Sequence, residues 1–459
     1  MANKDEKTYG SSQEKLALLF DAGSFVELGA YTKRADNADE FESVVCGYGA
    51  VEGALTFAFI QDSGRTRGAF GEQHANKIAN LYSLAVKNGA PVIGVFDSAG
   101  AVVYDGAGAL SAYGKFMKTV SDASGIIPQI AVIDGVCGGS SAIVASMFDL
   151  TVTVKESSSL YVNAPFVIGK EAGTPDFAAT NGLSAYTAES REAAMSFART
   201  LVSLLPQNNA GSIAHEAADD LNRKMCFDPA AYEASALCAE LADNGNFIRL
   251  YEAYTDKAVL GLATVGGMVT GVIASEPAKG GIVDIRTARA VTKLISFCDA
   301  FAIPVVTLVD SEGLDVSLEA ESASYASELA RLAMAYTTSD NAKITVVIGK
   351  AYGAAFALLG SKAVGADLAY ALEDATVSVL SPEASVAFVW NNRVGEKSRE
   401  ELMAEWKATH ASAKAAADLG AIDDVIAPDE LRKRICAGLL MLSAKAEGMP
   451  SRRHASLPL

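Results

Sequence analysis

The chain has 459 residues, half of them hydrophobic and a fifth charged, a composition that supplies a large core and excludes a disordered chain. Its net charge of −17 excludes the basic surface that nucleic-acid binding requires. No run approaches the roughly 18 consecutive apolar residues of a membrane span, and the first 15 residues contain no apolar signal-peptide region. Six cysteines without CxxC pairing are typical of free thiols, so we expect a cytoplasmic protein.

The first half of the sequence alternates apolar strands with helices. Residues 14–28 predict a short helix that ends at a turn, and residues 61–71 predict a loop rich in glycine and arginine. The other elements, in chain order, are two strands within 44–60, helix 72–88, strand 91–96, helix 107–124, strand 129–134 and helix 139–148. Strands that are apolar throughout are typical of a parallel sheet covered on both faces, which indicates the α/β class.

The second half repeats this order after a helical connection over 187–204 and 229–244. We place the domain boundary near 210–245, between a domain of residues 1–225 and a domain of residues 226–459. The elements that follow are strands within 263–274, a loop over 275–284, helix 285–301, strand 304–309, helix 319–336, strand 344–348, helix 353–362 and a mostly helical end from 396.

Short segments of the two halves also match in sequence. The matched pairs are 49–53 with 263–267 at an offset of 267 − 53 = 214, 90–100 with 303–313 at an offset of 213, and 133–142 with 348–357 at an offset of 215. Three collinear matches at nearly one offset indicate a duplicated domain. The chain therefore contains two similar sites, which suits a reaction that develops negative charge on two different partners.

Conventional catalytic groups are sparse. The four histidines, His74, His215, His410 and His454, lie far apart without HxxxH or HExxH spacing, so we expect no metal site. The turn at Ser140 is not a GxSxG elbow, and no Walker-type phosphate loop occurs. Side-chain nucleophiles, metals and ATP are therefore not indicated.

Backbone N–H groups are the remaining candidates for chemistry. In residues 136–140 and again in 352–355 a strand turns into a helix through small residues, which leaves N–H groups without partners. Such donors stabilise an enolate or similar oxyanion, by about 2.7–4 kcal/mol for each donor. The alternative is that glycine and alanine only permit close packing of helix on strand. The matched positions of the two loops favour the donor interpretation.

Several motifs together resemble the carboxyltransferase subunit of biotin-dependent acyl-CoA carboxylases, such as the propionyl-CoA and acetyl-CoA enzymes, and of sodium-pumping decarboxylases. The segments that carry the resemblance are 16–28 (LALLFDAGSFVEL), 71–78 (GEQHANKI), 90–101 (APVIGVFDSAGA), 127–130 (IPQI), 297–304 (FCDAFAIP) and 350–353 (KAYG). They are spread over nearly the whole chain. Each motif is weak by itself, and their joint occurrence is specific.

The resemblance implies two tandem crotonase-like domains of the ββα-superhelix (ClpP/crotonase) kind and a homohexamer in which the first domain of one subunit faces the second domain of another. Acyl-CoA would lie on the first domain, with its thioester oxygen facing the N–H groups of Gly139 and Ser140. Biotin would lie on the second domain, with its ureido oxygen facing Ala354 and Ala355. Carboxybiotin would release CO2, the biotin anion would remove the α-proton of the acyl-CoA, and the enolate would capture CO2.

The resemblance also implies partners and further contacts. The partners would be a separate biotin carboxyl carrier protein and biotin carboxylase or decarboxylase subunits, with no direct membrane insertion. The candidate substrate-binding residues are Ala99, Gly100, Ala101, Gly138, Gly353, Ala357, Arg65 and Arg67. Ala357 matches a family position that helps to select the acyl group. Arg65 and Arg67 are absent from the family pattern and are candidates for pairing with CoA phosphates, with a solvated loop as the alternative.

Several departures from the family keep a second hypothesis open, among them CGGSS at 137–141 in place of the family's CAGGA. The family's DSGGAR segment becomes DSAGAV at 97–102, which loses the arginine, and the loop 312–317 introduces two carboxylates near the biotin side. We therefore expect an active carboxyltransferase, with a divergent, poorly active subunit that scaffolds a biotin-dependent complex as the alternative. A crotonase-type hydratase or isomerase is a third hypothesis, for which no carboxylate pair has an evident place.

Overall fold

The computed structural model describes residues 12–35, 37, 39–446, 456 and 458, and the chain divides into two compact units, Met1–Ser212 and Ile213–Leu459. The predicted boundary at 225/226 lies further along the chain. Residues 213–225 belong to the second unit, because the His215 N–H donates to Gly267 O at 2.7 Å and the Val269 N–H donates to Ile213 O at 2.9 Å. Most of the expected loose segment 1–12, and His454, lie outside the described residues.

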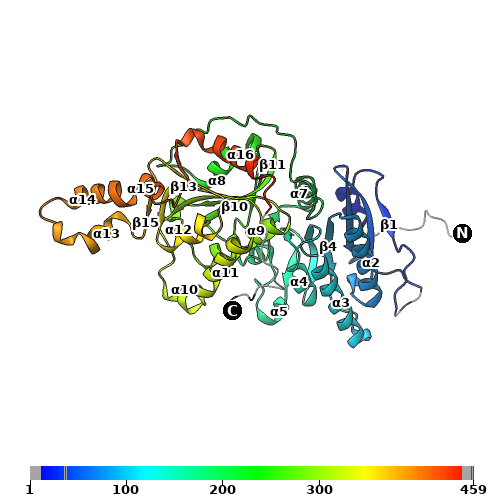
Figure 1. Ribbon diagram of the computed structural model, residues 1–459. Helices are drawn as coiled ribbons and strands as arrows, with labels where there is room; N and C mark the ends of the chain where they lie inside the picture. The colour runs from blue at the N-terminus through cyan, green and yellow to red at the C-terminus, as the bar shows by residue number, and fades with distance from the viewer. Residues whose placement is uncertain (1–11, 36, 38, 447–455, 457, 459) are drawn as a thin grey trace. The chain divides into compact units, whose positions relative to one another are not determined.

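The first unit is built on one twisted sheet in the order β1-β2-β3-β4-β5-β6-β8, with β7 paired to β5 (Figure 1). β1 to β3 are antiparallel, and the pairs from β3 through β8 are parallel. The strands are β1 Val26–Leu28, β2 Val44–Val51, β3 Ala54–Gln61, β4 Val92–Ser98, β5 Gln129–Gly138, β6 Leu150–Val154, β7 Ser159–Tyr161 and β8 Tyr186–Ala188. β4, β5 and β6 are almost entirely buried, as their continuous apolar sequence predicts.

The helices of the first unit alternate with these strands. They are α1 Ser12–Leu19, α2 Glu72–Asn88, α3 Ala107–Ala123, α4 Ser140–Ala145, α5 Pro165–Ile168, α6 Pro175–Thr180 and α7 Arg191–Leu204. The helix expected over 187–204 begins only at Arg191, because Tyr186–Ala188 pairs with β6 and the Ser190 hydroxyl caps the helix. The helix expected over 139–148 ends at Ala145.

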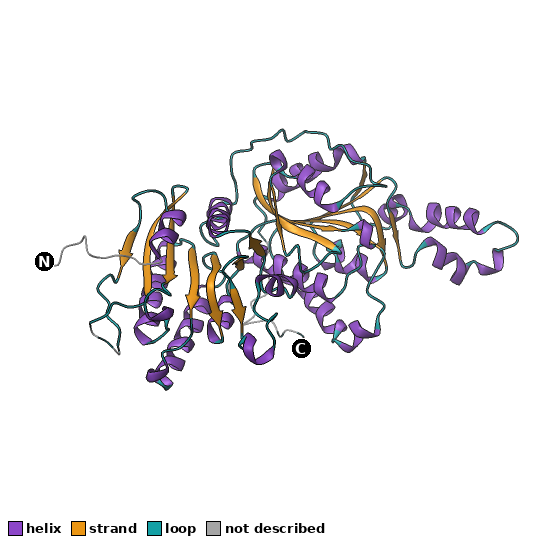
Figure 2. Ribbon diagram, turned by 180° about the vertical axis from the view of Figure 1, so that it is seen from behind, coloured by secondary structure: helices purple, strands orange, loops and turns teal. Residues whose placement is uncertain are grey.

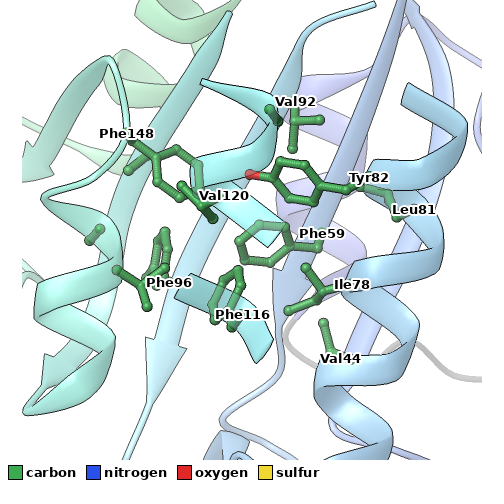
Figure 3. Packing of buried hydrophobic residues seen from close by; sticks show 14 of the residues in the cluster. Val44, Phe59, Ile78, Leu81, Tyr82, Val92, Phe96, Phe116, Val120 and Phe148 are labelled. Carbon is green, nitrogen blue, oxygen red and sulfur yellow. The ribbon is translucent and has the colours of Figure 1, made fainter. Parts of the chain in front are cut away.

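Aromatic rings fill the core between the sheet and helices α2 and α3. Phe59 of β3 meets the rings of Phe96, Phe116 and Phe148 edge-on, with centroid distances of 5.4, 5.6 and 6.4 Å (Figure 3). Edge-to-face pairs of this kind contribute about 0.5–1.5 kcal/mol each beyond the area they bury. This packing fixes the position of β4, whose carboxyl end leads to one of the predicted substrate loops.

The second unit repeats the topology of the first. Its sheet has the order β9-β10-β11-β12-β13-β14-β16, with β15 paired to β13 as β7 is paired to β5. The strands are β9 Phe247–Leu250, β10 Ala258–Val265, β11 Met268–Ser275, β12 Val305–Ser311, β13 Lys343–Tyr352, β14 Leu368–Leu372, β15 Thr376–Ser378 and β16 Asp424–Ile426. The duplication inferred from sequence is therefore confirmed strand by strand.

The helices of the second unit include one break that the sequence pattern does not reveal. They are α8 Ala234–Leu241, α9 Ile285–Ala300, α10 Leu318–Ser322, α11 Tyr325–Thr338, α12 Ala354–Leu358, α13 Pro382–Val389, α14 Arg399–Trp406, α15 Ala413–Asp418 and α16 Leu431–Leu442. The single helix expected over 319–336 is wrong, because Ser324 has φ 61° and separates α10 from α11. The helices expected over 229–244 and 353–362 are shorter, Ala234–Leu241 and Ala354–Leu358.

One aspartate in each unit holds the turn between the first two long antiparallel strands. Asp21 accepts N–H donors from the β2–β3 turn, and Asp243 accepts them from the β10–β11 turn. An arginine from a late helix completes each cluster: Arg199 of α7 lies 2.8 Å from Asp21, and Arg432 of α16 lies 2.6 Å from Asp243. The duplication therefore extends to polar contacts that the sequence matches do not include, partly exposed in the first unit and buried in the second.

Helices α13 and α14 pack on each other and project from the β15 end of the second sheet (Figure 2). The first unit has no described pair of helices after β7 that matches them in length, since α5 and α6 contain four and six residues. Within the described residues, none of the helices is both long and apolar enough to cross a membrane.

Candidate functional site

The carboxyl end of β5 leads through a left-handed glycine into α4. Gly139 has φ 60° and ψ −125°, a conformation that glycine adopts without steric cost. Its N–H donates to Tyr161 O at 2.9 Å, where β7 pairs with the end of β5. Ser140 and Ser141 are the first two residues of α4, so their N–H groups have no acceptor within the helix. The first unit therefore carries two adjacent backbone donors at this turn.

The second unit has the same turn at the end of β13. Gly353 has φ 58° and ψ −143°, and its N–H donates to Ser378 O of β15 at 2.9 Å. Ala354 and Ala355 are the first two residues of α12, and they carry the two donors without a partner in the helix. These are the two residues that the sequence analysis predicted for the second site.

The two capping glycines correspond at an offset of 353 − 139 = 214, one less than the offset of the sequence match between 133–142 and 348–357. Ser140 therefore corresponds to Ala354, and Ser141 corresponds to Ala355. Sequence reasoning chose Gly139, whose N–H is engaged by β7, and missed Ser141. Aligning the two capping glycines instead of the flanking apolar residues identifies the equivalent donors.

A second loop brings another donor to the first site. The Phe70 N–H donates to Gly100 O at 2.8 Å, and the Val102 N–H donates to Phe70 O at 2.9 Å. In this parallel bridge Phe70 bonds to the residues on either side of Ala101. The N–H of Ala101, an exposed residue, therefore points away from Phe70. The N–H groups of Ala99 and Gly100 are occupied by a carbonyl of the preceding loop and by the Ser98 hydroxyl. Of the three predicted residues, Ala101 is the one with a donor directed outward.

The second unit repeats this bridge, with one tyrosine hydroxyl placed between two of the backbone groups. Val283 pairs with Leu314, which occupies the place of Ala101 at an offset of 314 − 101 = 213. The hydroxyl of Tyr325 bonds to Val283 O and accepts from the Asp315 N–H at 2.9 Å, in place of the direct contact of the first unit. Leu314 is thus the candidate second donor of this site, and sequence reasoning missed it because its side chain suggests only packing.

A buried ion cluster lies under the two loops of the first site. Lys15 of α1 is 1% exposed, and its Nζ lies 3.3 Å from Asp97 Oδ2 and 3.1 Å from Asp134 Oδ2. The Ser63 hydroxyl donates to Asp97 at 2.5 Å, and Arg191 donates to Asp134 at 2.7 Å. Because Asp97 precedes the Ala99–Ala101 loop and Asp134 precedes the Gly139 turn, Lys15 joins the two strands that carry the donors. No sequence motif identified Lys15.

Within the described residues, the corresponding aspartate of the second site, Asp310, forms no ion pair with a lysine or arginine. Asp310 accepts from the Lys350 N–H at 2.9 Å and from the Tyr232 hydroxyl at 3.2 Å. Burial raises the pKa of the Asp310 carboxyl above its ordinary value, against these hydrogen bonds. Glu312, one of the carboxylates of the 312–317 loop, pairs with Lys350 Nζ at 2.6 Å. In the second site the aspartate is therefore held by a tyrosine hydroxyl, and the nearby lysine pairs with Glu312. In the first site the corresponding aspartate pairs with the buried Lys15.

A fully buried histidine supports the first site from α2. His74 lies between Glu42, whose Oε1 is 3.5 Å from Nδ1, and Gln61, whose Nε2 is 3.4 Å from the ring Nε2. Gln61 also accepts the Asp97 N–H at 3.1 Å. Burial lowers the pKa of His74 below its ordinary value of 6.5, although Glu42 opposes the shift. Burial opposes ionisation of Glu42, but hydrogen bonds from His74 and Ser43 lower its pKa below the ordinary 4.5.

We expect these shifts to make the protein acid-sensitive. His74 binds fewer protons in the folded chain than in the unfolded chain, so its contribution is complete above pH 6.5 and is lost as the pH falls below it; Glu42 acts in the same direction below pH 4.5. Chemical unfolding between pH 6.5 and 4.5 should therefore show a free energy of unfolding that decreases as the pH falls, and His74→Gln should flatten this slope. His410→Gln, at an exposed histidine, is the control. An unchanged slope in His74→Gln would contradict the assignment.

A cavity of about 810 Å³ opens beside the donor turn of the second unit. Its wall is mostly apolar and aromatic, and it is formed by α12, β15 and the segment from α13 to α15: Gly353, Ala354, Phe356, Val377, Ser378, Val379, Leu380, Ser385, Phe388, Val389, Trp406, His410, Ala416, Leu419 and Ala421. Phe388 and Val389 are largely exposed, and the centroids of the Trp406 and His410 rings lie 4.7 Å apart. The sequence analysis predicted a helix over 353–362 and a mostly helical end from 396, and neither prediction indicated the cavity.

The other predicted residues are more peripheral. Gly138 ends β5 directly before the first donor turn, and Arg65 lies 3.4 Å from Asp62. Arg67 is exposed in the same loop. Ala357 lies on α12 with an exposed side chain, whereas its neighbour Phe356 lines the cavity. Among the described residues, no group of three or more His, Cys, Asp and Glu side chains is placed to hold a metal ion.

Comparison with known proteins agrees with this geometry. Residues 10–457 match the Carboxyl transferase domain family. The chain is 32% identical to methylmalonyl-CoA decarboxylase subunit alpha of Propionigenium modestum, over 98% of this chain and 93% of that protein. It is 31% identical to a putative propionyl-CoA carboxylase beta chain of Bacillus subtilis, over 100% of this chain and 96% of that protein.

The structure is also similar to that of transcarboxylase 12S, a hexamer described with methylmalonyl-coenzyme A and methylmalonic acid bound. The two superpose with a TM-score of 0.92 at 28% identity, over 98% of this chain and 92% of the transcarboxylase chain. This similarity confirms the predicted crotonase-like α/β fold of the two tandem halves.

Proposed function

The chain belongs to the Carboxyl transferase domain family, and on that premise we propose that its two units divide one carboxyl transfer between them. As a member of this family it is an enzyme that transfers a carboxyl group on an acyl-CoA, with biotin carried on a separate subunit. In this proposal the first unit binds the acyl-CoA thioester and the second unit binds biotin. The supporting observation is the glycine-capped pair of N–H donors that occurs at the same place in both units.

The first unit would stabilise the enolate of the acyl-CoA. The N–H of Ser140, with those of Ser141 and Ala101 as neighbours, would donate to the thioester oxygen as negative charge develops on it. Backbone donors held by paired strands need no rearrangement during the reaction, which is why such sites stabilise the transition state more than the ground state. Lys15 would hold the two loops at the required separation.

The second unit would orient the ureido ring of biotin. The N–H groups of Ala354 and Ala355 would donate to the ureido oxygen, and the apolar wall of the adjoining cavity, including Phe356 and Trp406, would cover the ring and exclude water. Bound biotin supplies the carboxyl group and the base for the α-proton. The cavity lies directly beside Ala354, which supports this assignment of the second unit.

Partners and assembly follow from the relatives. Methylmalonyl-CoA decarboxylase subunit alpha and the propionyl-CoA carboxylase beta chains are by name subunits, and transcarboxylase 12S is a hexamer. We infer a homohexamer in which the first unit of one copy faces the second unit of another, served by a biotin carboxyl carrier protein and a biotin carboxylase or decarboxylase subunit. The six free cysteines support a cytoplasmic location.

Transcarboxylation with the full-length chain tests this function. The protein is incubated with malonyl-CoA or methylmalonyl-CoA and either free biotin or a biotinylated carrier protein, and the acyl-CoA products are followed by mass spectrometry. We expect release of acetyl-CoA or propionyl-CoA that depends on biotin. A folded hexamer that releases neither product with either biotin source would contradict the proposal and favour the scaffolding subunit.

A further inference from the structure

The loop between β3 and α2 contains two consecutive non-glycine residues in the left-handed region. Thr66 has φ 46° and Arg67 has φ 56°. A side chain with a Cβ disfavours this region because the Cβ approaches the following carbonyl oxygen. Backbone strain of this kind persists where the surrounding structure imposes it, and it is concentrated at functional positions.

The duplicated unit shows what this position requires of the backbone. The Ala99 N–H donates to Arg67 O at 2.9 Å, and in the second unit the Glu312 N–H donates to Gly280 O at 2.8 Å. Gly280 has φ 66°, so the second unit uses glycine at the place where the first unit uses arginine. A non-glycine residue in this left-handed conformation is therefore a particular property of the first site and not of the fold.

Arg67 also brings the first site an exposed positive charge, in addition to the buried Lys15 and to Arg65, which pairs with Asp62. Residues 97–114 and 134–154, which form the two donor loops and their flanks, contain no lysine or arginine. Lys15 is buried and paired with Asp97 and Asp134. Arg67 is exposed and, within the part of the chain that the structure describes, makes no ion pair. A guanidinium is a strong bidentate partner for a carboxylate or a phosphate.

We propose that Arg67 binds the free carboxylate of a carboxylated acyl-CoA, such as malonyl-CoA, and so distinguishes it from the uncarboxylated thioester. This inference rests on the proposed function, since it assumes that the thioester lies at the donors of the first unit. It specifies a residue that recognises the carboxylated partner of the reaction at that site.

The position of the backbone favours the carboxylate over the CoA phosphates. Arg67 is hydrogen-bonded to Ala99, two residues before the outward donor of Ala101, and β4 and β5 are adjacent strands about 4.8 Å apart. The carboxylate carbon of malonyl-CoA is two bonds from the thioester carbon, whereas the phosphates lie at the far end of the pantetheine arm. A side chain anchored beside the thioester donors is therefore placed for the carboxylate.

Binding measurements on the full-length chain test the proposal without biotin. Affinities for malonyl-CoA and acetyl-CoA are measured by titration calorimetry for wild type, Arg67→Gln, Arg67→Lys and Arg67→Gly. We expect Arg67→Gln and Arg67→Gly to lower the affinity for malonyl-CoA about ten-fold to a hundred-fold and to leave the affinity for acetyl-CoA unchanged. Arg67→Lys should retain part of the preference for malonyl-CoA over acetyl-CoA. Arg67→Gly reproduces Gly280 and relieves the strain, so its thermal midpoint should equal or exceed that of wild type.

Two outcomes would overturn this inference. Equal weakening of both ligands would place Arg67 on the CoA phosphates, which the two ligands share. Unchanged affinities for both ligands would indicate that residues 61–71 form a solvated loop without a role in binding. The wild-type chain could be inactive in transcarboxylation while Arg67→Gln still lowers the affinity for malonyl-CoA and not for acetyl-CoA. That result would support the binding site and contradict the proposed function, so failure of the function and failure of this inference are distinguishable.

Discussion

Replacing Ser140 by proline is expected to lower the rate of carboxyl transfer by roughly 10²–10³, the usual effect of removing one oxyanion donor. Ser140 is the first residue of α4, and this position accepts proline well because its N–H has no partner in the helix and the fixed φ of proline suits the first turn of a helix. The preceding Gly139 tolerates a following proline because it has no Cβ. The substitution therefore deletes the donor and leaves the fold.

Ala354→Pro is the matched variant of the second site, since Ala354 is the first residue of α12 and follows Gly353. We expect a loss of similar size, expressed in the use of biotin, while acyl-CoA binding by the first unit persists. Ser140→Ala and Ala354→Ser keep the N–H groups and serve as controls that should retain most of the activity. Transcarboxylation rates, with circular dichroism to confirm folding, provide the measurement. Full activity in a folded proline variant would exclude that N–H as a donor.

Lys15→Met is expected to destabilise the protein by about 3–5 kcal/mol, because it leaves a buried carboxylate without its cation. Asp134 keeps Arg191, but Asp97 retains the hydroxyl of Ser63 and loses the ammonium group of Lys15. The loops that follow both aspartates then lose their common anchor, so the variant should also lower the turnover rate at saturating acyl-CoA.

Urea unfolding of the wild type and the variant measures this effect. Lys118→Met is the control, because Lys118 pairs with Asp122 on the surface, where both side chains are more than half exposed, and little or no change in stability is expected. A free energy of unfolding for Lys15→Met within 1 kcal/mol of wild type would contradict the assignment of a structural ion cluster.

Local sequence signals predicted the regular parts of the chain well. The apolar strands at 91–96 and 129–134 appear as β4 and β5, and the helix expected over 285–301 appears as α9, because continuous apolar runs and helical periodicity depend on neighbours in the chain. The errors fall where distant backbone decides the outcome. Thr187 joins β8 because β6 supplies its hydrogen-bond partners, and Ser324 breaks a periodic helix.

The amino-acid sequence by itself determined the duplication, the family and the region of both donor turns, because each depends on short motifs read in order along the chain. Only the tertiary structure showed which amides are already engaged: β7 accepts the N–H of Gly139, which leaves Ser140 and Ser141 as the candidate donors of the first unit. It also revealed Lys15 between two distant aspartates and the cavity wall contributed by the α13–α15 segment. Hydrogen-bond occupancy and ion pairing across 82 and 119 residues of chain arise from packing, which no local pattern encodes.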